Sequence, residues 1–277
     1  LFDHFATSQL AIVDVATGKV SNVGRPAVYA DVDAAPDGRH VRVQVLKRPY
    51  SHVTTYGRFA HDVNVIDLAD GSVRTLASLP VADRVPVRGV PTGPRNFAWR
   101  ANQPATLDGG DWKVEVPARD RLLTLAAPFA GTPGEFARTK QRFGGLSWFE
   151  DGGRALLTEF DANRNWRTTR LVDADRAGDP GRVLWDLSTH ELYANPGSPQ
   201  GRVLPNGARV LREEGGALFL NGNGASPQGD RPFLDRYDLA SGQTVRLFRS
   251  DAAALERAVG FAGGDTSKLL TWHQSPA

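Results

Sequence analysis

The stretch VNVIDLADGSVRTLA at 63–77 decides the fold. Apolar and polar residues alternate up to Asp67, a short segment containing Gly71 follows, and the alternation then resumes. This pattern predicts two antiparallel strands joined by a tight turn, because glycine readily adopts the positive φ that such turns require. The same phrase recurs as LAIVDVATGKVSNV at 10–23 and DRYDLASGQTVRLF at 235–248, and its equivalent acidic residues are Asp14, Asp67 and Asp238.

A second kind of hairpin lies between these repeats. Three of its turns contain Asp-Gly or Asn-Gly, the dipeptides most typical of hairpin turns, and the fourth contains Gly-Gly-Asp. The four segments are YADVDAAPDGRHVRVQVL at 29–46, GGLSWFEDGGRALLTEF at 144–160, GRVLPNGARVLRE at 201–213 and AVGFAGGDTSKLLTWHQ at 258–274.

Two hairpins in a unit of roughly 50 residues are typical of a β-propeller, in which each blade has four strands. One hairpin cannot bury its apolar face alone, whereas stacked blades bury both faces. We count about five such units and therefore expect an all-β fold of the β-propeller class. The chain is expected to begin directly in a strand, and its best helix candidate is 251–258 with Ser250 as N-cap.

Composition excludes several classes of protein. No apolar run approaches the roughly 20 residues of a membrane helix, so no membrane partner is expected. The 33 basic and 31 acidic residues are interspersed, which argues against a nucleic-acid partner. The chain has no cysteine, which excludes disulfides, thiolate catalysis and cysteine-based zinc sites. A cysteine-free chain suits any redox compartment, so the bacterial cytoplasm and the periplasm both stay open.

The sequence lacks the common catalytic and cofactor motifs. Gly-x-Ser-x-Gly is missing, because the stretch that begins Gly145-Leu146-Ser147 continues to Phe149 instead of glycine. His190-Glu191 lacks the second histidine of a zinc-protease helix. No His or carboxylate set recurs once per repeat to bind a metal in a central channel. We therefore expect no cofactor, no metal and no catalytic residue within this stretch of sequence.

The segment Arg48–Arg58 interrupts the hairpin rhythm with an unusual density of recognition residues. Tyrosine and arginine supply rigid, polar-tipped contact surfaces, and an arginine fork matches a carboxylate with two hydrogen bonds. One interpretation is that this loop binds an acidic side chain or a peptide carboxyl terminus. The other is that its rings only fill space between blades. The candidate substrate-binding residues are Arg48, Tyr50, Tyr56 and Arg58.

Five segments resemble the propeller domain of the prolyl oligopeptidase family of serine peptidases, and most closely its glutamyl endopeptidase-like branch. Two of them, PVRGVPTGPRNFAWR at 86–100 and GASPQGDRPFLDR at 224–236, are long and unusual. The five segments are RPYSHVTTYGRF at 48–59, LASLPVADRVPVRGVPTGPRNFAWRANQPATL at 76–107, RDRLLTLAAPF at 119–129, NPGSP at 195–199 and GNGASPQGDRPFLDRYDLASGQTVRLFRS at 222–250.

The resemblance implies an arrangement of two domains. In that family a seven- or eight-bladed propeller caps an α/β-hydrolase domain that carries a Ser-His-Asp triad. Residues 1–277 are then expected to be an incomplete propeller domain whose partner is the following hydrolase domain of the same polypeptide. More strand usually separates PATL from DGGD in the family, so we expect residues to be absent between Leu107 and Asp108.

The resemblance also implies a function. The propeller is expected to gate and select short peptides for hydrolysis by the hydrolase domain, with cleavage after glutamate in this branch. A preference for peptides with an acidic residue before the cleaved bond needs a cation near that residue. Arg48 and Arg58 are the candidates for this cation. The alternative is a propeller without catalytic activity that binds a protein or a glycan. A gene that continues past Ala277 into a nucleophile elbow would favour the first function. The sequence does not indicate an oligomeric state.

Overall fold

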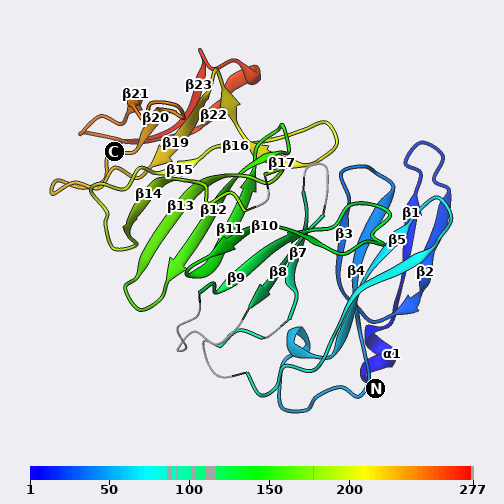
Figure 1. Ribbon diagram of the computed structural model, residues 1–277. Coiled ribbons are helices and arrows are strands. Elements are labelled where there is room, and N and C mark those ends of the chain that lie inside the picture. Colours follow the sequence, from blue (N-terminus) through cyan, green and yellow to red (C-terminus); the bar gives the residue numbers. More distant parts are fainter. Residues whose placement is uncertain (86–88, 92, 101–103, 110–116, 177, 276–277) are drawn as a thin grey trace. The chain divides into compact units, whose positions relative to one another are not determined.

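We describe the protein from a computed structural model. The structure describes residues 1–85, 89–91, 93–100, 104–109, 117–176 and 178–275, with only the backbone at 104–109 and 264. The chain divides into two compact units, Leu1–Glu135 and Phe136–Ala277. The described residues are organised almost entirely as antiparallel β-structure (Figure 1).

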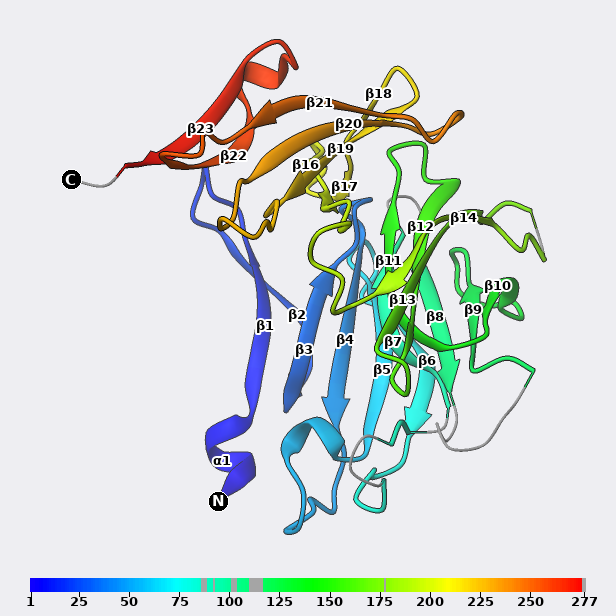
Figure 2. The same ribbon diagram turned by 90° about the vertical axis from the view of Figure 1, so that its left-hand side faces the viewer.

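The first unit begins with a short helix and a hairpin, followed by a four-stranded sheet in the order β3-β4-β5-β6. Figure 2 shows these four strands side by side in sequence order. A one-turn 3-10 helix, η1, lies in the connection between β4 and β5. The elements are α1 (Phe2–Ala6), β1 (Ser8–Val13), β2 (Val20–Ala27), β3 (Tyr29–Ala34), β4 (His40–Leu46), η1 (Tyr56–Arg58), β5 (His61–Asp67) and β6 (Val73–Leu79).

A second four-stranded sheet has the order β10-β9-β8-β7, and the boundary between the two units falls within β10. The strand β8 runs continuously through Leu107 and Asp108, which pair with Leu122 and Arg121. Asp108 and Gly109 therefore belong to a strand and not to the expected turn, while residues 110–116 lie outside the described part. The absence of residues between Leu107 and Asp108 stays a prediction. The strands are β7 (Arg95–Trp99), β8 (Pro104–Gly109), β9 (Asp120–Thr124) and β10 (Gly134–Thr139).

The second unit contains two further sheets and a final hairpin. One sheet has the order β11-β12-β13-β14, and the other has the path β15-β19-β20-β21 with β18 also paired to β19. The short hairpin β16–β17 and the hairpin β22–β23 stand as separate two-stranded sheets. The elements are β11 (Arg142–Trp148), β12 (Arg154–Asp161), β13 (Trp166–Asp173), β14 (Arg182–Ser188), β15 (Ser198–Pro199), β16 (Gly201–Val203), β17 (Arg209–Leu211), β18 (Glu213–Glu214), β19 (Ala217–Gly222), β20 (Phe233–Asp238), β21 (Thr244–Arg249), β22 (Leu255–Phe261), η2 (Ala262–Gly264) and β23 (Leu269–Gln274).

All seven hairpins expected from the sequence are present, and their turn residues have the expected roles. The Oδ1 atom of Asp14 accepts hydrogen bonds from the backbone N–H groups of Ala16 and Thr17, at 3.0 and 2.8 Å. Asp67 and Asp238 cap the β5–β6 and β20–β21 turns in the same way. The glycine four positions after each aspartate has a φ of 71° to 73°. The repeated phrase thus encodes one turn structure, used three times.

Two expectations about local structure were wrong. Residues 251–258 do not form a helix, because β22 begins at Leu255. Ser250 is fully buried and its Oγ donates to the carbonyl of Ala254 and accepts from the N–H of Glu256, which folds the chain into a turn. The first residues do not enter a strand directly, since the helix α1 precedes β1.

The cores lie between sheets within each unit. In the second unit, Phe149 and Leu156 of one sheet region pack against Leu218, Leu220 and Tyr237 of the next. In the first unit, Trp99 of β7 donates its indole N–H to the carbonyl of Asp33 on β3, at 3.0 Å. In the second unit, apolar side chains of successive sheets are therefore buried against each other, as they are between propeller blades.

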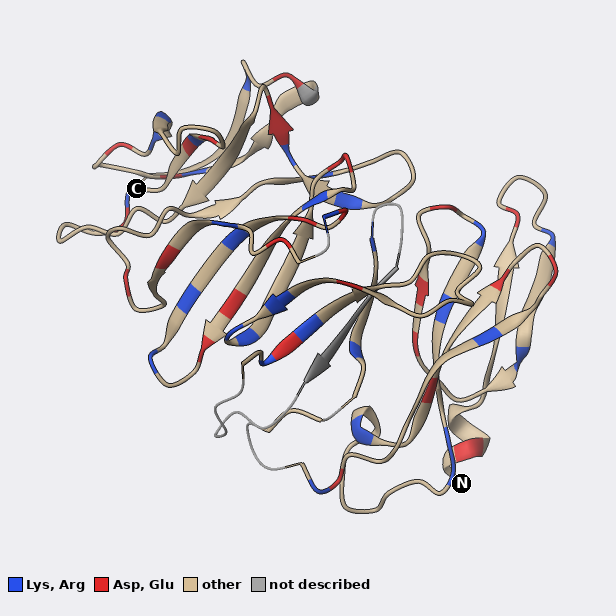
Figure 3. Cartoon of the chain, in the orientation of Figure 1, with Lys and Arg blue, Asp and Glu red and all other residues tan. Residues whose placement is uncertain are grey.

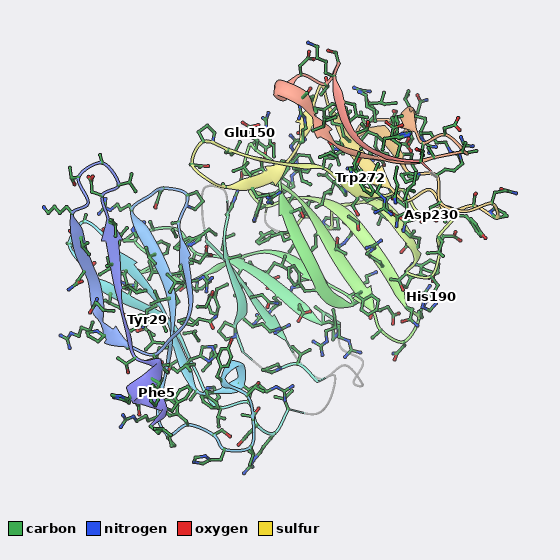
Figure 4. The ribbon with its side chains drawn as sticks, turned by 180° about the vertical axis from the view of Figure 1, so that it is seen from behind. Phe5, Tyr29, Glu150, His190, Asp230 and Trp272 are labelled. Carbon is green, nitrogen blue, oxygen red and sulfur yellow. The ribbon has the colours of Figure 1, made fainter. Side chains whose placement is uncertain are left out.

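Charged residues of both signs are interspersed along the strands and turns (Figure 3). Many of them form ion pairs with side chains that lie close by in space, as Arg39 does with Asp67 and Arg154 does with Asp151. Large apolar side chains also reach the surface: Trp272 on β23, labelled in Figure 4, is 52% exposed. No helix among the described residues is long and apolar enough to cross a membrane.

Candidate functional site

The Arg48–Arg58 segment connects β4 to β5 and ends in η1. The structure places its four candidate residues in two groups. Arg48 and Tyr50 contact the helix α1, whereas Tyr56 and Arg58 belong to η1. Phe59 joins the two groups, because the Tyr50 ring stacks on the Phe59 ring, with centroids 5.6 Å apart, and Phe59 also lines a cavity together with Arg58.

Arg48 and Tyr50 bind a carboxylate of the chain itself. The guanidinium of Arg48 contacts both oxygens of Asp3, with Nη2 at 2.6 Å from Oδ2 and Nε at 3.2 Å from Oδ1. The hydroxyl of Tyr50 donates to Oδ1 of Asp3 at 2.6 Å. The ring of Phe2 packs edge-on against Tyr50 at 4.7 Å. Arg48 and Tyr50 therefore bind the Asp3 carboxylate of α1, and their role in binding a substrate stays a prediction.

These contacts shift the ionisation of all three groups. The hydrogen bond from Tyr50, together with Arg48, lowers the pKa of the Asp3 carboxyl. The same hydrogen bond to Asp3 raises the pKa of Tyr50, because the ionised phenol would lose it. Hydrogen bonding to Asp3 raises the pKa of Arg48. Each shift favours the state in which Asp3 is charged and Tyr50 keeps its proton.

Arg58 lies at a cavity of about 300 Å³ in the first unit. This volume is at the lower end of the range for small-molecule sites, about 300–1,000 Å³. The walls are mostly apolar, with Phe59, Phe97 and three prolines among them. The basic side chains among the described lining residues are Arg58, Arg95 and His61, and these lining residues include no carboxylate.

The three basic side chains differ in the partners that they already have. Arg95 is paired with Asp120, whose side chain is fully buried. Nδ1 of His61 lies 2.8 Å from the carbonyl oxygen of Phe59, so this nitrogen carries a proton and Nε2 has the lone pair in the neutral ring. Arg58 is exposed, and among the described residues its guanidinium donates to the carbonyl of Val85 alone, at 3.3 Å. Of the two arginines that line this cavity, Arg58 is thus the one that no described carboxylate binds.

Tyr56 is 60% exposed. It forms no side-chain hydrogen bond with another described residue. The sequence did not indicate the roles of Asp3, Arg95 or Asn96, although Asn96 has a positive φ of 54° at the cavity wall. Within the described residues, no group of three or more His, Asp or Glu could hold a metal ion.

These observations define the class of the protein. Four-stranded antiparallel meanders that follow one another along the chain form an all-β protein of the β-propeller class. No family model matches the sequence. A solved oligogalacturonate lyase in complex with manganese superimposes with a TM-score of 0.51, at 13% sequence identity, covering 97% of this chain and 72% of its own. That likeness concerns the fold alone.

The sequence comparison is more specific. The chain is 37% identical over 266 residues to the "Probable glutamyl endopeptidase, chloroplastic" of Arabidopsis thaliana, and 34% identical over 266 residues to the protein of the same name from Oryza sativa subsp. japonica. Each match covers 91% of this chain and 28% of the relative. The chain is therefore homologous to a segment of the glutamyl endopeptidases of the prolyl oligopeptidase family, which confirms the resemblance seen in the sequence. It spans 28% of the length of these relatives.

Proposed function

We propose that this chain is the substrate-selecting propeller of a serine peptidase that cleaves short peptides after glutamate. The observation that carries the proposal is the 37% identity, over 91% of this chain, to a protein named a probable glutamyl endopeptidase. Bond cleavage would belong to a Ser-His-Asp site on an α/β-hydrolase domain of the same polypeptide. The propeller contributes by excluding folded proteins and by orienting the peptide that enters.

Within this function, we assign the recognition of an acidic side chain to Arg58. Arg48 already binds Asp3 through Nε and Nη2, whereas Arg58 has no carboxylate partner in the part of the chain that the structure describes. The cavity beside Arg58 offers apolar walls for methylene groups and no described carboxylate that would repel an anion. An arginine at such a position attracts the charged side chain of a glutamate more strongly than it attracts an uncharged side chain.

The test is the selectivity of the full-length polypeptide for two peptides that differ only by Glu or Gln before the cleaved bond. We expect Arg58→Ala to lower kcat/KM for the Glu peptide by about tenfold and to leave the Gln peptide within about twofold. Arg74→Ala is the matched control, because Arg74 is an exposed arginine on the neighbouring strand β6 and does not line the cavity. An equal loss for both peptides would refute charge pairing by Arg58.

A further inference from the structure

The second unit contains a separate small cavity, of about 100 Å³. One wall is the face of the β11–β14 sheet, and the other is the segment 196–199 that leads into β15. The residues of the sheet wall are Ser147, Leu156, Thr158, Arg167, Thr169, Trp185 and Leu187.

The sheet register explains why these side chains share one face. Thr158 of β12 pairs with Thr169 of β13, which in turn pairs with Trp185 of β14. Arg167 lies two positions before Thr169 on β13 and pairs with Leu187. Side chains of cross-strand partners point to the same side of a sheet, and so do those two positions apart. The cavity wall therefore presents one cation between hydroxyl and apolar groups.

Arg167 differs from Arg154 and Arg170 of the same sheet. Arg154 binds Asp151 and Glu213, and Arg170 binds Glu159. Arg167 is half-buried and forms no ion pair or hydrogen bond with any residue in the described part of the chain. No carboxylate occurs among the residues that line the cavity. A half-buried guanidinium in this setting gains stability from an anion beside it.

The threonine pair adds a hydrogen-bond donor. Oγ1 of Thr158 and Oγ1 of Thr169 lie 3.2 Å apart, so one hydroxyl donates to the other. Two hydroxyls have two protons, and this bond uses one of them. The second proton is available to an acceptor in the cavity. Arg167 and the threonine pair together can therefore donate to an oxyanion from two directions.

The opposite wall is held closely against the β19 strand. Gly197 has a φ of 87°, and a Cβ atom there would lie 2.4 Å from the carbonyl oxygen of Asn221. The side chain of Asn195 accepts a hydrogen bond from the N–H of Gly197 at 2.9 Å. Pro196 and Pro199 restrict the backbone on either side. The position of this wall is thus fixed by close contact and by restricted backbone freedom.

We propose that this cavity binds a carboxylate attached to a short hydrocarbon group, with Arg167 as the principal ligand. One cation matches one negative charge, and the planar guanidinium fork matches a planar carboxylate. A volume of about 100 Å³ holds the equivalent of about three waters at ~30 Å³ each, enough for a carboxylate and one or two carbons. The apolar groups of Leu156, Leu187 and Trp185 suit the attached carbons. This chemistry is shared by free short-chain acids and by the carboxyl terminus of a peptide.

Calorimetric titration of the protein tests the site with three probes: propionate, N-acetyl-Ala-Ala with a free carboxylate, and the same dipeptide as its terminal amide. We expect at least one of the two carboxylates to bind and the amide not to bind. Tighter binding of propionate assigns the site to free acids, whereas tighter binding of the dipeptide assigns it to peptide ends.

Arg167→Gln should weaken carboxylate binding at least tenfold. Arg164→Gln is the matched control, because it removes a positive charge from the same hairpin, where Arg164 lies over the Trp166 ring at 4.7 Å and does not line the cavity. It should change affinity by less than twofold. Ser198→Phe keeps Arg167 and fills the cavity from the opposite wall, and it should abolish binding even if Arg167→Gln does not fold. The proposal is overturned if neither carboxylate binds. It is also overturned if binding is unchanged in a folded Arg167→Gln or in Ser198→Phe, or if the two arginine variants lose affinity equally.

Discussion

At the scale of single residues, aspartate side chains organise the turns of this protein. Asp67 is the clearest case, because its carboxylate binds the Arg39 guanidinium with Nη2 at 2.7 Å and also accepts from the N–H of Ala69. The bonds from Arg39 and from Ala69 lower the pKa of Asp67 from its ordinary value of 3.8 to about 2. The Asp67 carboxylate, which begins the β5–β6 turn, thus also binds a side chain of the β3–β4 turn.

An NMR titration of Asp67, followed at its carboxyl carbon, tests whether Arg39 lowers the pKa of this group. We expect a pKa of about 2 in the protein. In Arg39→Ala it should rise toward 3.8 and stay below that value, because the N–H of Ala69 still donates. Because the folded pKa is lowered, the stabilisation from Asp67 is complete above pH 3.8 and is lost as the pH falls through about 2. A pKa unchanged by Arg39→Ala, or one changed equally by Arg74→Ala, would contradict this account.

The sequence indicated which types of residue lie at the candidate site, but not which residues they contact. Arginine and tyrosine at 48–58 predicted a segment that binds a substrate carboxylate, which stays a prediction, and in the structure Arg48 and Tyr50 bind a carboxylate of the chain itself. The carboxylate is Asp3, which lies 45 and 47 positions away in the chain. Short-range patterns do not specify such pairs, because they depend on how the sheet and α1 pack together.

At the scale of elements, hairpins were predictable because their signals are local. The alternation of apolar and polar residues determines which side chains share a face of the strand, and an Asp-Gly or Asn-Gly pair determines where the chain turns. One further Asp-capped turn was missed: Asp161 accepts from the N–H groups of Asn163 and Arg164, and Asn165 adopts the positive φ, 51°, that glycine has elsewhere. Asn in place of Gly concealed the repeat, although asparagine tolerates the same conformation. The false helix at 251–258 arose because a capping serine also stabilises tight turns.

The contact between the 195–199 segment and β19 gives a prediction about one element. Gly197→Ala places a methyl group 2.4 Å from the Asn221 carbonyl oxygen, so the segment must shift. We expect a loss of about 3 kcal/mol or more in the free energy of unfolding, measured by urea denaturation.

Gly18→Ala is the matched control, because Gly18 also has a positive φ, 71°, but has no atom within 4 Å of a Cβ position. It should cost only about 1 kcal/mol, from the left-handed backbone alone. Equal losses in the two variants would mean that the close approach to β19 does not stabilise the segment.

At the scale of the whole molecule, the sequence predicted the class through its repeats and the family through its unusual segments. Both predictions are confirmed by the four-stranded sheets and by the relatives at 37% and 34% identity. Neither cavity was predictable, because each is lined by residues from several strands and loops whose approach is set by packing. The single propeller domain over 1–277 stays a prediction.

In the proposed function, this chain selects peptides and another domain of the same polypeptide cleaves them. The most direct measurement compares the full-length polypeptide with the isolated 277-residue segment, in cleavage of a Glu-containing peptide and in labelling by a serine-directed fluorophosphonate. We expect cleavage and labelling of the full-length polypeptide and neither for the segment. Reproducible cleavage by the segment alone, or an inactive and unlabelled full-length polypeptide, would contradict the claim.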